Sequence, residues 1–262
     1  MTSCKAAVCI LVLAVVGARG WSAPLAAQRP VRQDVLVAAA ASLSGIAPQL
    51  THAFHDATGI DLRFNFGGSN TLARQIVEGA RVDAFVSADA AQMDVVERSG
   101  RLVEGTRVSV VSNRLAVIVG KSPAAQAFRV DDLASPRTQR VAMGDPAAVP
   151  AGVYGRRWLE VVRLWSMVQP KVVPLPSSPA VVAAVRAGRA EFGVVYASDV
   201  WNRRDISVAY VVPVEDAPEI AYPAAVITGG RILLARQFVD FLRSAPAQRI
   251  FESAGFRAVG AR

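Results

Sequence analysis

The stretch VLVAAAASLSGIAPQLTHAFHDATG, residues 35–59, decides how this chain folds. Its first seven residues, VLVAAAA at 35–41, form a continuous apolar run, which is typical of a strand buried on both faces of a sheet. Apolar residues then recur at helical spacing until Gly59, a residue type that commonly ends helices. They are Leu43, Ile46, Leu50, Phe54 and Ala57. A buried strand followed directly by an amphipathic helix predicts an α/β fold.

The same alternation continues along the chain. Helices are predicted from Leu72 to Val77 and from Ala180 to Ala187. Further strands are predicted at Leu62–Phe66, Ala84–Ser87, Arg140–Met143, Val172–Leu175 and Phe192–Tyr196. Strands that alternate with helices imply mixed, mostly parallel sheets with helices on both faces.

Two stretches break this alternation. They are VSVVSNRLAVIV at 108–119, a long strand-like run with a polar centre, and PVEDAPEIAYPAAVI at 213–227, which is rich in proline. Each is a candidate crossing between two lobes. Two crossings make one lobe discontinuous, so we expect lobe 1 to comprise residues 28–112 plus 224–262 and lobe 2 to comprise residues 113–223.

Residues 1–27 have the pattern of a secretory signal peptide. Lys5 supplies the positive start, and an uncharged stretch of 13 residues follows from Ala6 to Ala18. That stretch is shorter than the ~20 residues of a membrane span, although a short membrane anchor is the alternative. Small residues ending at Ala27 provide a cleavage site, which predicts export to the periplasm. Both cysteines of the chain lie in this segment, so the mature protein would contain no thiol.

The charge balance of the chain is basic. Its 262 residues include 29 Lys and Arg against 21 Asp and Glu, a formal charge of +8, and loss of Lys5 and Arg19 with the signal peptide lowers this to +6. A basic exported protein can meet nucleic acid, a membrane surface or a small anion. The arginines form no runs and do not alternate with aromatic residues, which argues against nucleic acid.

Hydroxyl residues open several of the predicted helices. Ser42 follows the first strand, Ser69 follows Gly67-Gly68, and Ser177-Ser178 precede Pro179. A fourth helix starts at Val149-Pro150-Ala151-Gly152. Helix N-termini carry free backbone N–H groups and partial positive charge, and in open α/β sheets they gather where ligands bind. The pattern favours an anion site built from neutral donors, with ordinary helix capping by the serines as the alternative.

Other chemistries have weaker support in the sequence. His52 and His55 are the only histidines, and without a third ligand nearby they make a poor metal site. An enzyme would need a serine beside a base, and only Asp145 or Asp199 beside Ser42 or Ser69 could supply one. Tyr196, at the end of a predicted strand, is either a core aromatic or a hydroxyl donor to a ligand.

Seven segments in order resemble the periplasmic molybdate-binding protein family, the substrate-binding component of molybdate ABC transporters. The similarity extends over essentially the whole mature chain. The segments are AAASL at 39–43, FGGSNTLARQI at 66–76, VDAFVSAD at 82–89, GDPAAVPAGVYG at 144–155, GVVYASD at 193–199, YPAAVI at 222–227 and FLRSAPAQRIFESAGF at 241–256.

The resemblance implies a two-lobe, type II periplasmic-binding-protein fold that closes around one tetrahedral oxyanion. It implies ligand contacts from Ser42 and Ser69 in the first lobe, through their hydroxyls and backbone N–H groups. From the second lobe it implies the backbone N–H of Ala151, the hydroxyl of Tyr196 and a backbone N–H at Ser178. The last position departs from the family pattern of a polar residue, valine and arginine, because this chain has Ser177-Ser178-Pro179 there.

The resemblance also implies a monomeric, non-enzymatic protein without a cofactor, which delivers molybdate, and also tungstate, to a membrane permease. Molybdate, tungstate and sulfate are fully deprotonated dianions near neutral pH, whereas hydrogen phosphate carries a proton that needs a buried acceptor. Neutral donors would therefore exclude phosphate, and sulfate would be too small for the cavity. The alternatives are a binding protein for a different oxyanion, an enzyme on the same scaffold, and a sensor without a transporter.

Overall fold

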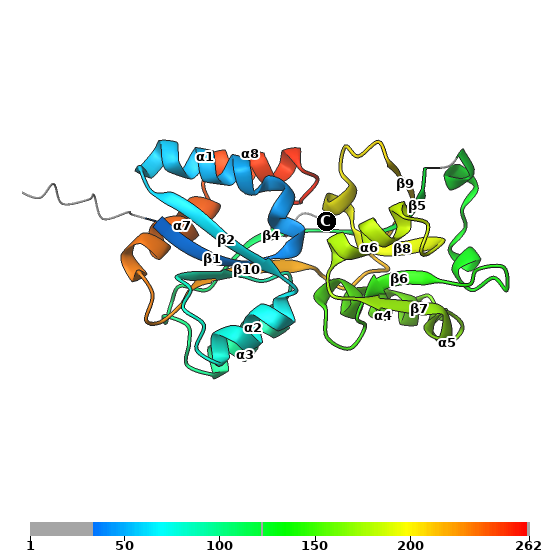
Figure 1. Ribbon diagram of the computed structural model, residues 1–262, viewed down its shortest axis with the longest axis horizontal. Helices are drawn as coiled ribbons and strands as arrows, with labels where there is room; N and C mark the ends of the chain where they lie inside the picture. The colour runs from blue at the N-terminus through cyan, green and yellow to red at the C-terminus, as the bar shows by residue number, and fades with distance from the viewer. Residues whose placement is uncertain (1–33, 122, 261–262) are drawn as a thin grey trace, which may run out of the picture. The chain divides into compact units, whose positions relative to one another are not determined.

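The computed structural model describes residues 34–121 and 123–260, so the predicted signal peptide at 1–27 lies outside the described residues. These described residues form two sheets of five strands each (Figure 1). The first sheet has the order β2 (Asp61–Gly67), β1 (Asp34–Ala40), β3 (Ala84–Val86), β10 (Ala221–Val226) and β4 (Val108–Ser112). The second has the order β7 (Val172–Leu175), β6 (Val141–Gly144), β8 (Phe192–Tyr196), β5 (Leu115–Gly120) and β9 (Ile206–Val211).

The two sheets share one pairing pattern. β1 pairs in parallel with β2 and β3, and β6 pairs in parallel with β7 and β8. β10 is antiparallel to β3 and β4, and β5 is antiparallel to β8 and β9. The predicted α/β fold class with mixed, mostly parallel sheets is confirmed: four strands of each sheet run in one direction, and β10 or β5 runs against them.

The chain passes between the sheets at the two predicted stretches. Only Asn113 and Arg114 separate β4 of the first sheet from β5 of the second. The return follows β9 and ends at Ala221, which already pairs with Ser112. The predicted lobe boundary at residue 224 therefore falls inside β10, and we propose to place it before Ala221.

Helices cover both faces of each sheet. Around the first sheet, α1 and α8 lie on one side and α2 and α3 on the other (Figure 1). The helices of this part are α1 (Ala47–Thr58), α2 (Ser69–Val77), α3 (Ala90–Arg98), α7 (Ile232–Leu242) and α8 (Ala245–Ser253). The second sheet is accompanied by α4 (Pro150–Val161), α5 (Trp165–Val168) and α6 (Ser178–Arg186). Short 3₁₀ helices are η1 (Ala41–Ile46), η2 (Pro123–Ala127), η3 (Val130–Leu133), η4 (Gln169–Lys171) and η5 (Ala197–Val200).

The apolar periodicity that predicted the first helix forms the core on one face of the first sheet. Phe54 of α1 is fully buried, and its ring lies 5.7 Å from the ring of Phe238 and 5.3 Å from that of Phe241, both in α7. Gly59 ends the helix with φ +70°, and its N–H donates to His55 O at 2.7 Å. Gly59 suits this left-handed cap because it has no Cβ. Between the strand and α1, however, the chain forms the 3₁₀ helix η1, which contains Ser42.

In the part of the chain that the structure describes, no helix is both long enough and apolar enough to cross a membrane.

Candidate functional site

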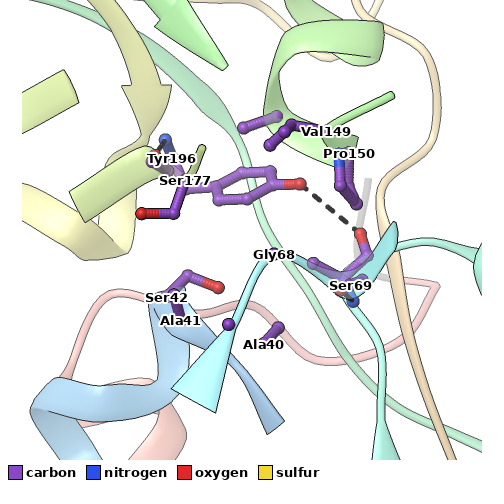
Figure 2. Close-up of a pocket in the computed structure, with 13 residues that line it drawn as sticks. Ala40, Ala41, Ser42, Gly68, Ser69, Val149, Pro150, Ser177 and Tyr196 are labelled. Atoms are coloured by element: carbon purple, nitrogen blue, oxygen red, sulfur yellow. Dashed lines mark hydrogen bonds between the residues drawn. The ribbon is translucent and has the colours of Figure 1, made fainter. Parts of the chain in front are cut away.

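The candidate site is a small pocket at the carboxyl ends of strands from both sheets (Figure 2). The space among its lining residues, including open solvent, is about 230 Å³. The first sheet contributes Ala40, Ala41, Ser42, Gly67, Gly68, Ser69 and Ala88, and the second contributes Val149, Pro150, Ala151, Ser177, Ser178 and Tyr196. None of these lining residues carries a charged side chain, so the pocket fits a small ligand held by neutral groups.

Two of the pocket serines are not helix caps. The residue that caps α2 is Gly68, and the residue that caps η1 is Ala40, and neither helix start has a side-chain capping bond. Ser177 is the true cap, since its Oγ accepts the Ala180 N–H of α6 at 3.3 Å. The capping alternative is therefore correct for Ser177 and wrong for Ser42 and Ser69.

The hydroxyl of Ser69 accepts one hydrogen bond from the protein, and its own hydrogen can still be donated. It is 1% exposed and is the first residue of α2. Its Oγ accepts the backbone N–H of Ala88 at 2.9 Å. A hydroxyl has one hydrogen to donate. With the oxygen facing Ala88 N, that hydrogen is available to a ligand in the pocket.

Ser42 lines the pocket on the side of the first sheet, and its hydroxyl forms a hydrogen bond with a tyrosine 180 residues later in the chain. Its Oγ is 2.9 Å from Oη of Tyr222 in β10. Tyr222 is fully buried and accepts a hydrogen bond from Nδ2 of Asn113 at 3.4 Å. Sequence reasoning missed both Tyr222 and Asn113. Buried tyrosines need a hydrogen-bond partner, and this signal, which had drawn attention to Tyr196, could have drawn attention to Tyr222 as well.

Close packing brings the start of α4 against the end of β6. A Cβ added to Gly152 would lie 2.0 Å from Gly144 O and 2.6 Å from Asp145 O, so only glycine fits there. The first N–H groups of a helix lack intrahelical partners. Pro150 has no N–H, and Gly152 N already donates to Val149 O at 2.9 Å. Ala151, which lines the pocket and is 1% exposed, therefore presents the unpaired N–H of this helix start.

Ser178 contributes differently from Ser42 and Ser69. Its hydroxyl donates to Asp199 Oδ2 and accepts the Tyr196 N–H at 3.2 Å, so the side chain is fully engaged. Asp199 also accepts the Tyr196 N–H at 3.1 Å, and burial raises the pKa of its carboxyl to about 7. What Ser178 can offer to the pocket is its backbone N–H, because it is the first residue of α6.

Tyr196 reaches into the pocket from the end of β8, as Figure 2 shows. Its hydroxyl donates to Ala88 O across the two sheets, at a long 3.4 Å. Burial raises the pKa of the phenol well above its usual value, so the hydroxyl keeps its proton at neutral pH. A weak bond of this length can be exchanged for a better one to a ligand.

Gly68 allows the two halves of the site to approach closely. A Cβ added there would lie 2.7 Å from the carbonyl oxygen of Pro176 in the second sheet's half, and equally close to Asn70 Oδ1. The group that approaches Gly68 is thus the backbone of the other half, whereas a Cβ added to Gly67 would meet only the Leu72 side chain at 3.3 Å.

The structure brings all five predicted site residues, Ser42, Ser69, Ala151, Ser178 and Tyr196, to this one pocket. Neither carboxylate of the enzyme alternative lines this pocket: Asp199 bonds to Ser178, and Asp145 Oδ1 accepts the Ala147 N–H at 2.9 Å. His52 and His55 lie on the surface of α1 beside Asp56 and Asp61. Within residues 34–121 and 123–260, no group of three or more His, Cys, Asp or Glu side chains is placed to hold a metal ion.

Comparison with known proteins identifies the family. The model of the bacterial extracellular solute-binding protein family matches residues 35–257. The molybdate-binding protein ModA of Escherichia coli is 32% identical over 226 residues, which are 85% of this chain and 88% of that protein. Among solved structures, the substrate-binding domain of a putative molybdenum ABC transporter from Clostridium difficile is 31% identical, with a TM-score of 0.68 over 86% of this chain and 99% of its own.

A more distant structure agrees in fold. The periplasmic molybdate-binding protein of Azotobacter vinelandii superposes with a TM-score of 0.77 over 85% of this chain and 98% of its own, at 22% identity. The fold thus recurs in a protein that differs widely in sequence. The chain belongs to the bacterial extracellular solute-binding proteins and, among them, to the periplasmic molybdate-binding protein family.

Proposed function

We propose that this protein binds one molybdate ion, and tungstate equally, in the pocket between its two halves and delivers it to an ABC transporter. The observation that carries the proposal is the set of uncharged donors that converge on the pocket. These are the hydroxyls of Ser42, Ser69 and Tyr196 and the backbone N–H groups of Ala151 and Ser178. The names of its relatives, which bind molybdate, support the same ligand.

The balance of donors and acceptors favours a fully deprotonated anion. Ser42, Ser69 and Tyr196 each have a hydrogen to offer, and helix starts add N–H groups with partial positive charge. The lining residues include no carboxylate that could accept a proton from the ligand. Hydrogen phosphate would bring a proton without a carboxylate partner, and an unpaired buried donor costs about 1–3 kcal/mol. Molybdate, tungstate and sulfate carry no such proton, so size separates sulfate from the other two.

The rest of the proposed function follows from the family. Its members are extracellular solute-binding proteins, so we infer export, with residues 1–27 as the signal peptide and the periplasm as the destination. The partner is a membrane permease that accepts the ligand from the closed protein. The protein acts as a monomer without a cofactor and catalyses no reaction.

Ligand-induced stabilisation tests this function. A ligand that binds only the folded state stabilises it by about 2.7 kcal/mol at a concentration one hundred times its Kd. We expect a concentration-dependent rise in Tm with molybdate and tungstate, and no rise with phosphate at the same concentrations. A protein whose Tm does not respond to molybdate or tungstate would contradict the proposal.

A further inference from the structure

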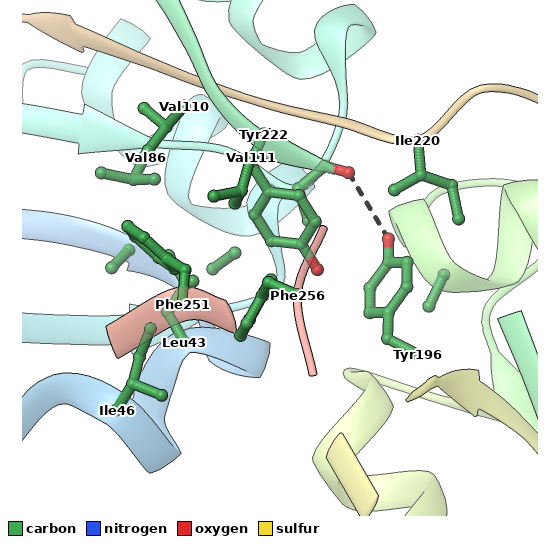
Figure 3. Packing of buried hydrophobic residues seen from close by; sticks show 14 of the residues in the cluster. Leu43, Ile46, Val86, Val110, Val111, Tyr196, Ile220, Tyr222, Phe251 and Phe256 are labelled. Atoms are coloured by element: carbon green, nitrogen blue, oxygen red, sulfur yellow. Dashed lines mark hydrogen bonds between the residues drawn. The ribbon is translucent and has the colours of Figure 1, made fainter. Parts of the chain in front are cut away.

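Tyr222 lies behind the pocket and is not among the residues that line it. Its ring is fully buried and packs edge-on against Tyr196 and Phe256, with ring centroids 5.8 Å and 5.5 Å apart. Figure 3 shows it between Tyr196 and the apolar cluster of the first sheet. Its hydroxyl is its one polar group, and this hydroxyl faces Ser42 Oγ at 2.9 Å.

The direction of the hydrogen bonds around Tyr222 can be derived from Asn113. The Arg114 N–H can only donate, and it lies 2.9 Å from Oδ1 of Asn113, which fixes the orientation of the amide. Nδ2 of Asn113 must therefore donate, and it contacts Ser198 Oγ at 2.8 Å and Tyr222 Oη at 3.4 Å. Tyr222 accepts from Asn113, so its single hydrogen is left for Ser42.

Ser42 connects Tyr222 to the pocket. If Ser42 Oγ accepts from Tyr222, the Ser42 hydrogen must point to a third partner, and Ser42 lines the pocket. Burial raises the pKa of Tyr222 well above its usual value, so the phenol stays a donor at any physiological pH. The chain of donors thus runs from Asn113 through Tyr222 and Ser42 into the pocket.

We propose that Tyr222 and Asn113 are positioning residues that hold the Ser42 hydroxyl in its donating orientation toward the bound oxyanion, an inference that rests on the proposed function. Neither residue touches the anion. Both lie where the chain crosses between the sheets: Asn113 separates β4 from β5, and Tyr222 belongs to β10, the strand that returns. Because Asn113 also holds Ser198 of η5, the orientation of Ser42 depends on the placement of the second sheet's half.

A double-mutant cycle tests this inference. Molybdate affinity is measured by calorimetry on the purified protein, on Tyr222→Phe, and on Tyr222→Phe combined with Ser42→Ala or with Ser69→Ala. A positioning role predicts that Tyr222→Phe weakens binding about tenfold in the unsubstituted and Ser69→Ala backgrounds, the worth of roughly one hydrogen bond. In the Ser42→Ala background it should change the affinity less than about twofold, because no hydroxyl remains to orient.

A purely structural role of Tyr222 predicts something else. If the hydroxyl of Tyr222 served only to stabilise the surrounding structure, its loss would weaken binding by the same factor in the Ser42→Ala and Ser69→Ala backgrounds, and that result would overturn the inference. Unchanged affinity in Tyr222→Phe would overturn it as well. If the unsubstituted protein binds no molybdate, the proposed function fails and the inference with it, whereas binding with equal losses in both backgrounds overturns the inference alone.

Asn113→Asp provides a second test that keeps the hydroxyls of Tyr222 and Ser42, should Tyr222→Phe fold poorly. A carboxylate can only accept, so Tyr222 would turn its hydrogen toward residue 113 and take the hydrogen of Ser42. The added negative charge repels the anion in every background. The reversal of the donor chain adds a further loss only where Ser42 is present, so affinity should fall by a larger factor there than in Ser42→Ala. Equal factors would overturn the inference.

Discussion

Ser69→Ala separates a ligand donor from an ordinary helix residue. Ser69 is 1% exposed, it is the first residue of α2, and its Oγ accepts the Ala88 N–H at 2.9 Å. The substitution removes the hydroxyl hydrogen that is available to a ligand, since Ser69 lines the pocket. It also leaves the Ala88 N–H without its partner.

The two losses have different sizes and different readouts. A hydrogen bond to a charged group is worth about 1.5–3 kcal/mol, which corresponds to roughly 10- to 150-fold in affinity. The unpaired Ala88 N–H costs about 1–3 kcal/mol in the free energy of unfolding, whether or not ligand is present. We therefore expect Ser69→Ala both to weaken molybdate binding by at least about tenfold and to destabilise the free protein.

Ser244→Ala is the matched control. Ser244 caps α8, where its Oγ accepts the Ala247 N–H at 3.4 Å, and it does not line the pocket. Loss of a serine cap costs about 1 kcal/mol of stability. Calorimetric titration with molybdate and urea denaturation of both variants provide the comparison, and Ser244→Ala should lose stability while its affinity stays unchanged.

One result would refute the reasoning about Ser69. If Ser69→Ala loses stability but binds molybdate within about twofold of the unsubstituted protein, the hydroxyl serves only to hold Ala88. Ser42→Ala would then be the remaining serine variant with which to test, by the same comparison of affinity and stability, whether a hydroxyl in the pocket donates to the ligand.

Three further predictions follow from the structure. Asp199, whose pKa burial raises to about 7, binds more protons in the folded than in the unfolded state between about pH 4 and 7. The free energy of unfolding should therefore fall as pH rises through that window, by at most about 1.4 kcal/mol per pH unit. Urea denaturation should show that Asp199→Asn lacks this decline. Gly68→Ala places a Cβ 2.7 Å from Pro176 O, so calorimetry should show weaker molybdate binding, whereas Gly45→Ala, which meets nothing within 4 Å, should bind normally. In competition titrations tungstate should displace molybdate with an affinity within about tenfold, since the donors bind oxygen atoms and not the metal.

Most of the fold could be predicted from local patterns. The apolar run at 35–41 and the helical spacing after it correspond to β1, η1 and α1, because buried strands and amphipathic helices depend on neighbouring residues. The antiparallel insertion of β10 could not be predicted in this way. β10 pairs with β3 and β4, more than a hundred residues earlier in the chain, and no local signal specifies such a partner.

The site residues also differ in whether a local sequence pattern could predict them. Ser42 and Ser69 could be predicted because helix starts after buried strands mark the ligand edge of an α/β sheet. The residue behind Ser42 could not, since Tyr222 is 180 positions away and the bond depends on how the chain returns between the sheets. The hydroxyl of Ser178, one of the serines at these helix starts, is committed to Asp199, which only the arrangement of η5 against α6 reveals.

The most direct test of the donor pocket is a calorimetric titration of the purified protein with molybdate, sulfate and phosphate in turn, at neutral pH. A pocket of neutral donors predicts one molybdate per chain, far weaker sulfate binding and no phosphate binding. Phosphate binding as tight as that of molybdate would contradict the account, because the lining residues provide no carboxylate to accept the phosphate proton.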